Sequence, residues 1–219
     1  MIVSMWMTRE VVTITGSERI DQAAKRLVEN RIRRLPVVQD YAGDEVVVGL
    51  LSKTDLLHAY PANVNPLRGG PFSGMDDLPL VSEVMSSPVI QVDPTEPLEV
   101  ATELMRSRKV GALPVVSEGE LVGIITESDI FKAFSSLLTG GENPVRVTFD
   151  GLDEGLEYFA ENIAQAARGS GMTLASLISF EWKGRKRAVA RAVGPNPDDF
   201  IGAIRVIGYR VLSIQKGQS

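Results

Sequence analysis

Residues 7–38 and 85–116 repeat one sequence pattern, and this repeat restricts the fold more than any other feature of the chain. MTREVVTITGSERIDQAAKRLVENRIRRLPVV aligns without a gap with MSSPVIQVDPTEPLEVATELMRSRKVGALPVV. After the shared LPVV, the first copy carries four extra residues at a turn rich in Gly and Asp, and GLLSKTD (49–55) then aligns with GIITESD (123–129). A chain that repeats one motif is expected to fold into two similar units.

Each copy contains a short apolar segment, a helix, two apolar strands around a polar turn, and the start of a second helix near Ser52 or Thr126. In the first helix, apolar residues follow the spacing of a helix that buries one side. Ser17 and its counterpart Thr95 occupy predicted N-cap positions. LPVV, VVVGLL and LVGII are continuous apolar runs, typical of strands covered on both faces. Because a unit of about 50 residues buries little surface alone, we expect both copies to form one domain.

The two copies resemble a tandem pair of cystathionine-β-synthase (CBS) domains, often called a Bateman module. The resemblance rests on LPVV followed by GLLSKTD, and on LPVV followed by GIITESD. It implies a pseudo-twofold pair of βαββα units over residues 1–138. Repeat one is expected at about 5–60 and repeat two at about 81–138, with a surface linker rich in Pro and Gly at about 61–80.

Residues 144–219 follow a different pattern, without a third copy of the repeat. The predicted order βαββαβ indicates a ferredoxin-like antiparallel sheet backed by two helices. The Asp-Gly turn after the first strand, ARGSGM at the end of the first helix and the final GYRVLSI resemble an ACT domain, a small-molecule-sensing module. The whole layout resembles bacterial acetoin-utilisation-type regulatory proteins. The predicted fold class is therefore α/β for the pair and α+β for the C-terminal domain.

Two short motifs support two interpretations. Ser52-x-x-Asp55 and Thr126-x-x-Asp129 fit the capping box, in which a hydroxyl and a carboxylate each bind a backbone amide at a helix start. The CBS resemblance implies instead that each Asp contacts ribose hydroxyls. A carboxylate can accept two hydrogen bonds from a cis-diol, and free amides at a helix N-terminus attract phosphate. Both interpretations stay open, and the hydroxyl can serve both.

The two copies differ in charge beside the expected cleft. Arg31, Arg33 and Arg34 precede the first LPVV, whereas the second copy has Lys109, followed by Gly and Ala, at these positions. Guanidinium groups suit phosphate because they offer fixed bidentate donors. Arg33, Arg34 and Lys109 are therefore candidate phosphate ligands, and the two sites are expected to be unequal. The alternative is ordinary solvated charge beside a helix end.

The CBS resemblance also places a nucleotide base against the early strand of each copy. The residues that it implies are Val12, Thr13 and Ile14 in the first copy, and Ile90, Gln91 and Val92 in the second. Core packing is the alternative for the apolar members of this set, and it does not exclude contact with a ligand.

Composition excludes several other functions. The net charge of −5 disfavours general attraction to nucleic acid or anionic membranes. The basic segment WKGRKR (182–187) is interpreted as a solvated hairpin tip, and contact with RNA or a partner is the alternative. With no Cys and one His, no metal site is predicted. No phosphate-binding or nucleophile motif of known enzymes is present, so no catalytic residue is predicted. No apolar run approaches the roughly 20 residues of a membrane helix, and we expect a cytoplasmic protein.

These features predict a non-enzymatic sensor. The CBS resemblance implies that the pair binds an adenosine-containing regulatory ligand, such as AMP, ADP, ATP or S-adenosylmethionine, and passes a conformational change to a protein partner. The ACT-like domain would supply dimer contacts or a second effector site, and family analogy implies a homodimer. No catalytic cofactor is expected. The alternative is an oligomerisation scaffold whose ligand sites are degenerate.

Overall fold

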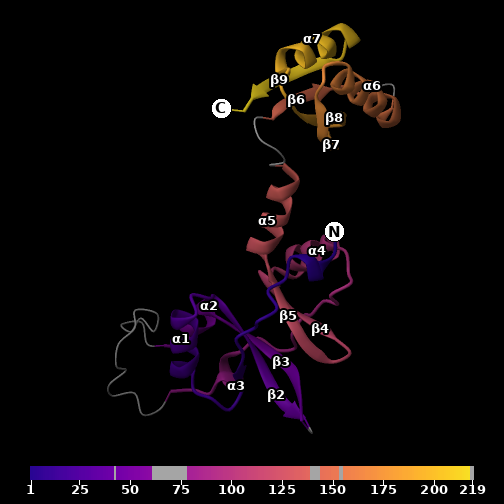
Figure 1. The fold of residues 1–219 in the computed structure, drawn as a ribbon. Coiled ribbons are helices and arrows are strands. Elements are labelled where there is room, and N and C mark those ends of the chain that lie inside the picture. The colour runs from indigo at the N-terminus through magenta and orange to yellow at the C-terminus, as the bar shows by residue number, and fades with distance from the viewer. Residues whose placement is uncertain (42, 61–77, 139–143, 153–154, 218–219) are drawn as a thin grey trace. The chain divides into compact units, whose positions relative to one another are not determined.

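The computed structural model describes residues 1–41, 43–60, 78–138, 144–152 and 155–217 (Figure 1). The chain divides into two compact units, Met1–Ala133 and Phe134–Ser219, and each unit is described by itself. Most of the predicted linker, and most of the predicted break after residue 138, lie outside the described residues. In the described part of the chain, every helix is too short or too polar to cross a membrane.

The first unit contains the two sequence copies as two similar sets of elements (Figure 1). The first set is β1 (Ile14–Thr15), α1 (Ile20–Glu29), β2 (Arg34–Tyr41), β3 (Asp44–Ser52) and α2 (Lys53–Ala59). The second set is α4 (Leu98–Arg108), β4 (Ala112–Ser117), β5 (Glu120–Thr126) and α5 (Glu127–Leu138). Two short segments, η1 (Val3–Met5) and α3 (Val81–Val84), precede the two sets. In the second copy, a single parallel bridge between Val92 and Val115 takes the place of β1.

Each copy builds an antiparallel hairpin around its LPVV segment. β2 pairs with β3 and β4 pairs with β5, and the register shifts at the same point of both hairpins, between Val37 and Val38 and between Val115 and Val116. All four LPVV residues are buried in the first copy, and the first three are buried in the second. The LPVV runs are thus covered on both faces, as predicted. In β3 and β5, by contrast, buried residues alternate with half-buried ones such as Val48 and Ile124.

The first residues of the two copies exchange partners. Thr8, at the start of the first copy, forms two backbone hydrogen bonds of 2.9 Å with Ile124 on β5 of the second copy. The equivalent residue Ser86 forms the same pair of bonds, 3.1 and 2.9 Å, with Leu50 on β3 of the first copy. Each sheet is therefore extended by the start of the other copy, and this exchange joins the two copies.

Gly49 and Gly123, the first residues of the two aligned motifs, provide space for this exchange. The sulfur of Met7 lies 2.6 Å from the position that a Cβ atom on Gly123 would take. Met85 covers Gly49 in the same way. Any side chain at either glycine would collide with the methionine from the other copy. Packing therefore accounts for the Gly that begins GLLSKTD and GIITESD.

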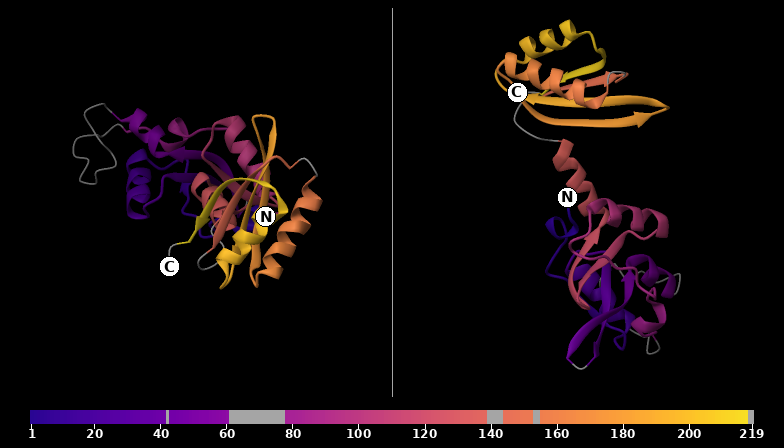
Figure 2. Two further views of the ribbon diagram at one scale, coloured as in Figure 1. Left: turned by 90° about the horizontal axis from the view of Figure 1, so that it is seen from above. Right: turned by 90° about the vertical axis from the view of Figure 1, so that its right-hand side faces the viewer.

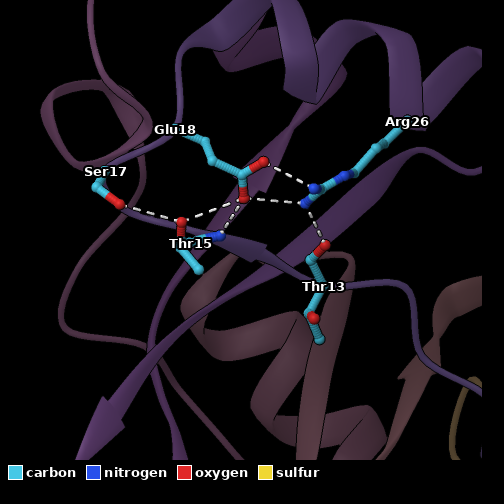
Figure 3. Close-up of polar contacts among 5 residues, drawn as sticks. All are labelled: Thr13, Thr15, Ser17, Glu18 and Arg26. Carbon is cyan, nitrogen blue, oxygen red and sulfur yellow. Dashed lines mark hydrogen bonds and ion pairs between the residues drawn. The ribbon is translucent and has the colours of Figure 1, made fainter.

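The predicted N-caps of the first helix in each copy are wrong. α1 begins after Arg19, and neither α1 nor α4 has a side-chain hydrogen bond at its N-cap. The Ser17 hydroxyl instead lies 3.2 Å from the Thr15 hydroxyl (Figure 3). Thr95 donates its amide and its hydroxyl to Oδ1 of Asp93, at 2.8 and 2.5 Å. Both hydroxyl groups stabilise the turn before the helix, so they are not available to the helix amides.

A salt bridge between Glu18 and Arg26 ties α1 to the segment around β1 (Figure 3). Arg26 donates from Nη2 to Oε1 of Glu18 at 2.7 Å and from Nη1 to the backbone oxygen of Thr13 at 2.8 Å. Oε2 of Glu18 accepts the Thr15 amide at 2.9 Å. Burial alone would raise the pKa of Glu18, but the Thr15 amide and the Arg26 charge outweigh it, so this pKa lies below its ordinary value.

The second unit has the predicted βαββαβ order. Its elements are β6 (Val145–Asp150), α6 (Leu156–Gly169), β7 (Thr173–Trp182), β8 (Arg185–Val193), α7 (Pro197–Ile207) and β9 (Arg210–Lys216). The antiparallel sheet has the order β7-β8-β6-β9, and Figure 2 shows both helices on one face of it. Phe149, Phe159 and Phe200 are fully buried between the two layers. The ferredoxin-like fold is thus confirmed; the assignment to ACT domains stays a prediction.

Candidate functional site

A hollow of about 370 Å³ in the first unit is lined by both copies. The first copy contributes the apolar pair Val11 and Val12, and the cluster of Arg31, Arg33 and Arg34. The second copy contributes the start of α5, with Thr126, Asp129 and Lys132. The exchange of leading segments brings the early strand of one copy beside the helix start of the other. Five of the predicted binding residues therefore lie around one hollow: Val12, Arg33, Arg34, Thr126 and Asp129.

Asp129 is only 7% exposed, yet its carboxylate borders the hollow. Oδ2 accepts the Thr126 amide at 3.0 Å and the Thr126 hydroxyl at 2.6 Å. Oδ1 accepts Nζ of Lys132 at 3.3 Å. Lys132 is largely solvent-exposed, so this contact can be exchanged at little cost. The buried carboxylate is held in place by Thr126, and its second oxygen is open to exchange.

The equivalent pair in the first copy forms a complete capping box. Ser52 donates its amide to Oδ2 of Asp55 at 2.7 Å, and Asp55 donates its amide to Oγ of Ser52 at 3.2 Å. The capping interpretation is therefore confirmed as local structure in this copy. In the second copy the Thr126 hydroxyl donates to the carboxylate instead. The two motifs are equal in sequence pattern but differ in hydrogen bonding.

The arginine cluster contributes positive charge to the hollow. In the described part of the chain, Arg31, Arg33 and Arg34 have no carboxylate within ion-pair distance. The Arg34 guanidinium fills the space that a side chain on Gly111 would need, and its Cζ lies 3.0 Å from that position. Gly111 thus lets an arginine of the first copy reach across to the second.

Arg31 and Lys109, which are equivalent in the alignment, share an unusual backbone conformation. Their φ angles are 53° and 55°, in the left-handed region that costs an L-residue about 1 kcal/mol. A glycine is the commonest residue in that conformation at the end of a helix. Both copies instead place a cation there, and Arg31 lines the hollow.

The alignment of the copies predicts what the equivalent second cleft contains. Ser52 and Asp55 take the places of Thr126 and Asp129, and Lys109 takes the place of Arg31. Ala112 replaces Arg34, and His58 replaces Lys132. We therefore expect Asp55 to face a cleft with fewer fixed cations than the cleft at Asp129.

The remaining residues predicted to contact a base have varied surroundings. Ile14 and Val92 are buried in the cores of the first and second copy, and Ile90 packs against the second core. Gln91 is exposed. Thr13 borders a smaller hollow of about 280 Å³, and its backbone oxygen binds Arg26. Of these early-strand residues, the described lining of the larger hollow includes Val12.

Sequence reasoning missed several residues that line this hollow, namely Thr8, Glu10, Glu127 and Lys132. Lys132 could have been found, because it follows Asp129 by three positions and therefore lies on the same side of the helix. Thr8 and Glu10 reach the site through the exchange of leading segments. The alignment of two contiguous copies carries no sign of that exchange.

A second hollow, of about 830 Å³, lies in the C-terminal unit beside the end of β6. The buried carboxylate of Asp150 accepts Nε of Arg187 at 2.9 Å and Nη1 of Arg185 at 2.8 Å, and Arg210 lies 3.7 Å away. The hydrogen bond from Arg187 and the charges of the three arginines outweigh burial, so the pKa of Asp150 lies below its ordinary value. Tyr158 also lines this hollow.

The model of the CBS domain matches residues 3–62 and 81–136, which together make up more than half of the chain. The chain belongs to the CBS domain family. The hollow at Asp129 is thus a cleft between the two CBS repeats of one chain.

Two curated relatives show the extent of this similarity. Uncharacterized protein MJ1225 of Methanocaldococcus jannaschii is 31% identical over 137 residues, which cover 61% of this chain and 47% of the relative. This CBS-domain protein therefore spans about half the length of that relative. CBS domain-containing protein YhcV of Bacillus subtilis is 30% identical over 124 residues, which cover 57% of this chain and 79% of the relative.

Three solved structures resemble the chain over a similar share of its length. A putative acetoin utilization protein (AcuB) from Vibrio cholerae has a TM-score of 0.50 at 29% identity, covering 63% of this chain and 93% of that chain. CBSX2 in complex with AMP has a TM-score of 0.51 at 28% identity, covering 63% and 98%. The CBS domain pair of protein MJ0100, in complex with 5-methylthioadenosine and S-adenosyl-L-methionine, has a TM-score of 0.51 at 26% identity, covering 62% and 97%.

Proposed function

We propose that this CBS-domain protein is a non-enzymatic cytoplasmic regulator that binds an adenosine-containing ligand in the hollow at Asp129. One observation carries the proposal: a buried carboxylate held by Thr126 and a cluster of three arginines line the same hollow. A carboxylate suits ribose hydroxyls and guanidinium groups suit phosphate. The complexes of CBSX2 with AMP and of MJ0100 with two adenosine compounds support this class of ligand.

The hydrogen bonds of Asp129 define how a ribose would enter. A carboxylate offers about four acceptor positions, and the Thr126 amide, the Thr126 hydroxyl and Lys132 use three of them. A cis-diol has two donors, so it would displace the exposed Lys132 from Oδ1. Lys132 would then be free to join the arginines at the phosphate. Val11 and Val12 supply an apolar wall for the base.

The unequal cations predict unequal clefts. Arg31, Arg33, Arg34 and Lys132 line the cleft at Asp129, so its affinity should increase with the number of ligand phosphates. The cleft at Asp55 has Lys109 as its equivalent of Arg31 and Ala112 in place of Arg34. It should therefore favour adenosine ligands with little negative charge, such as S-adenosylmethionine.

Regulation would follow from the position of the ligand between the repeats. A ligand that contacts both copies stabilises the orientation that it fits best, and this bias can be passed to a protein partner. A homodimer is also proposed, because the equivalent residues Leu57 on α2 and Phe131 on α5 are 46% and 74% exposed. The C-terminal unit, proposed as an ACT-like domain at residues 144–219, would add dimer contacts or an effector site in the hollow at Asp150.

The second candidate function is an oligomerisation scaffold without ligand. The complete capping box of Ser52 and Asp55 favours it, because this motif already has a structural role in the absence of a ligand. Thermal unfolding with AMP, ADP, ATP and S-adenosylmethionine separates the two functions. A ligand at 100 times its Kd stabilises the folded protein by about 2.7 kcal/mol. If none of the four raises Tm, the sensor proposal fails and the scaffold stands.

A further inference from the structure

The face of the C-terminal sheet opposite α6 and α7 carries a concentration of arginines. On β6, Val145, Val147 and Phe149 belong to the core, so Arg146 and Asp150 point to the other face because side chains alternate along a strand. We call this other face the open face. Its arginines are Arg146 on β6, Arg185, Arg187 and Arg191 on β8, and Arg210 on β9.

Arg146 and Arg191 form a pair of like charges on the open face. They are direct partners in the register of β6 and β8. Nε of Arg146 is buried without a hydrogen-bond partner among the described residues. Burial and the charge of Arg146 lower the pKa of Arg191, as expected for two neighbouring guanidinium groups that repel each other. An anion bound between them would relieve this repulsion.

The other three arginines of the open face share one carboxylate, that of Asp150. The described rows of this face therefore hold five guanidinium groups against one acid. From Arg185 to Arg191, β8 is about 20 Å long at the rise of an extended strand. Four described acids of the unit lie on the helices, namely Glu157, Glu161, Asp198 and Asp199. Glu181 lies on β7, but it alternates with Phe180 and Trp182 and so points to the opposite face of the sheet. The open face is therefore basic, although the whole chain has a net negative charge.

Two exposed aromatic rings lie on the same face as the arginines. Phe180 and Trp182 are 42% and 54% exposed, and they pair across the hairpin with Arg187 and Arg185. They are two residues apart on β7 and hence on the same side of the sheet. Exposed aromatic rings beside a row of basic residues are typical of proteins that bind single-stranded nucleic acid, because the bases stack on the rings while the cations bind the phosphates.

We propose that the open face of the C-terminal unit binds single-stranded RNA through Phe180, Trp182 and the five arginines. An acidic peptide would satisfy the arginines but leave the stacking surfaces unused. A membrane would contact the hairpin tip, whereas Arg146 and Arg191 form the arginine row that lies farthest from the tip. A second copy of the sheet would place arginines against arginines.

Fluorescence anisotropy of the full-length protein with a labelled single-stranded oligouridine tests the proposal. Binding should weaken as the salt concentration rises. Arg146→Gln should reduce the slope of log affinity against log salt concentration by about 0.7, because it removes one phosphate contact. Trp182→Ala and Phe180→Ala should each weaken binding by roughly tenfold. The matched controls are Tyr41→Ala on β2, which is 53% exposed and so close to Trp182 in exposure, and Arg205→Gln on α7, and both should bind as wild type.

Several results would overturn the proposal. They are the absence of oligouridine binding, an equal loss of binding in the controls, and binding to polyglutamate or phosphatidylserine vesicles in place of RNA. Circular dichroism checks that each variant is folded. Since Phe180 and Trp182 are both exposed, at least one aromatic variant should keep the fold and give a clear result.

Discussion

The sulfur of Met7 lies 2.6 Å from the position of a Cβ atom on Gly123, so a residue at the start of the first CBS repeat completes the core of the second. Met85 and Gly49 repeat this relationship in the opposite direction. The two repeats are therefore joined by exchanged segments. The hollow at Asp129 depends on this exchange, because Thr8 enters its lining through the same segment.

Gly123→Ala should lower the free energy of unfolding by about 1–3 kcal/mol, the usual cost of overfilling a packed core. The added methyl group would meet the Met7 sulfur and the Thr8 backbone oxygen, 3.0 Å away, which cannot rotate aside. Urea unfolding measures the loss. In the double variant Met7→Ala/Gly123→Ala, the cost should be smaller than the sum of the two single costs.

Gly202→Ala is the control for this experiment. Gly202 lies in α7 with open space at its Cβ position, so alanine should stabilise the helix by roughly 0.5–1 kcal/mol. If Gly123→Ala were as harmless as Gly202→Ala, the close contact between the repeats would be contradicted.

Glu18→Gln should lower the free energy of unfolding by about 1 kcal/mol at pH 7, since it removes the charge that Arg26 binds. The pKa of Glu18 in the folded protein lies below its ordinary value of 4.5. The stabilisation is therefore complete above about pH 4.5 and is lost as the pH falls through the lower folded pKa. Urea unfolding of both proteins from pH 7 to pH 3 should show their difference shrinking, and a constant difference would contradict this account.

Arg34→Gln should weaken AMP or ATP binding by roughly 10- to 100-fold, because it removes a charged hydrogen bond to phosphate. Binding of adenosine, which has no phosphate, should change by less than about twofold. Isothermal titration calorimetry measures both affinities. Lys109→Gln is the matched control in the other cleft, and it should leave the phosphate dependence of the Asp129 cleft unchanged. Equal losses for adenosine and ATP would argue against a phosphate role for Arg34.

Phe131→Lys should dissociate the proposed homodimer, because it places a charge in an apolar contact. Sedimentation velocity at several protein concentrations measures the state of association. Val206→Lys on α7 is the control, since Val206 is also an exposed apolar residue. A wild-type protein that stays monomeric at every concentration, or a dimer that tolerates Phe131→Lys, would exclude this interface.

The repeat and the apolar periodicity were sufficient to predict most of the fold. The βαββαβ order of the C-terminal unit followed from local patterns, because each strand and helix there packs against its neighbours in sequence. The N-caps at Ser17 and Thr95 were wrong because side chains at each turn compete for the same hydroxyl groups. Propensity alone does not decide such a competition.

The candidate site was only partly predictable. Thr126 and Asp129 could be named from their motif, and Arg33 and Arg34 from the difference between the copies. The sequence did not predict which carboxylate lies beside the arginines, because the exchange of segments brings the arginines of one copy into the same hollow as the carboxylate of the other. The packing role of Gly49 and Gly123 could not be predicted either. Both residues belong to a motif that resembles a ligand-binding family, and this resemblance favours a ligand-binding role over a packing role.

Calorimetric titration of Asp129→Ala tests the central claim most directly. The ligand is the one among AMP, ADP, ATP and S-adenosylmethionine that binds most tightly to the arginine-lined cleft of the wild-type protein. Asp55→Ala is the matched control, because each variant removes one helix cap and should lose about 1 kcal/mol of stability. The account predicts that Asp129→Ala weakens binding at this cleft by roughly 10- to 100-fold while Asp55→Ala leaves it unchanged. Wild-type affinity in Asp129→Ala would contradict it.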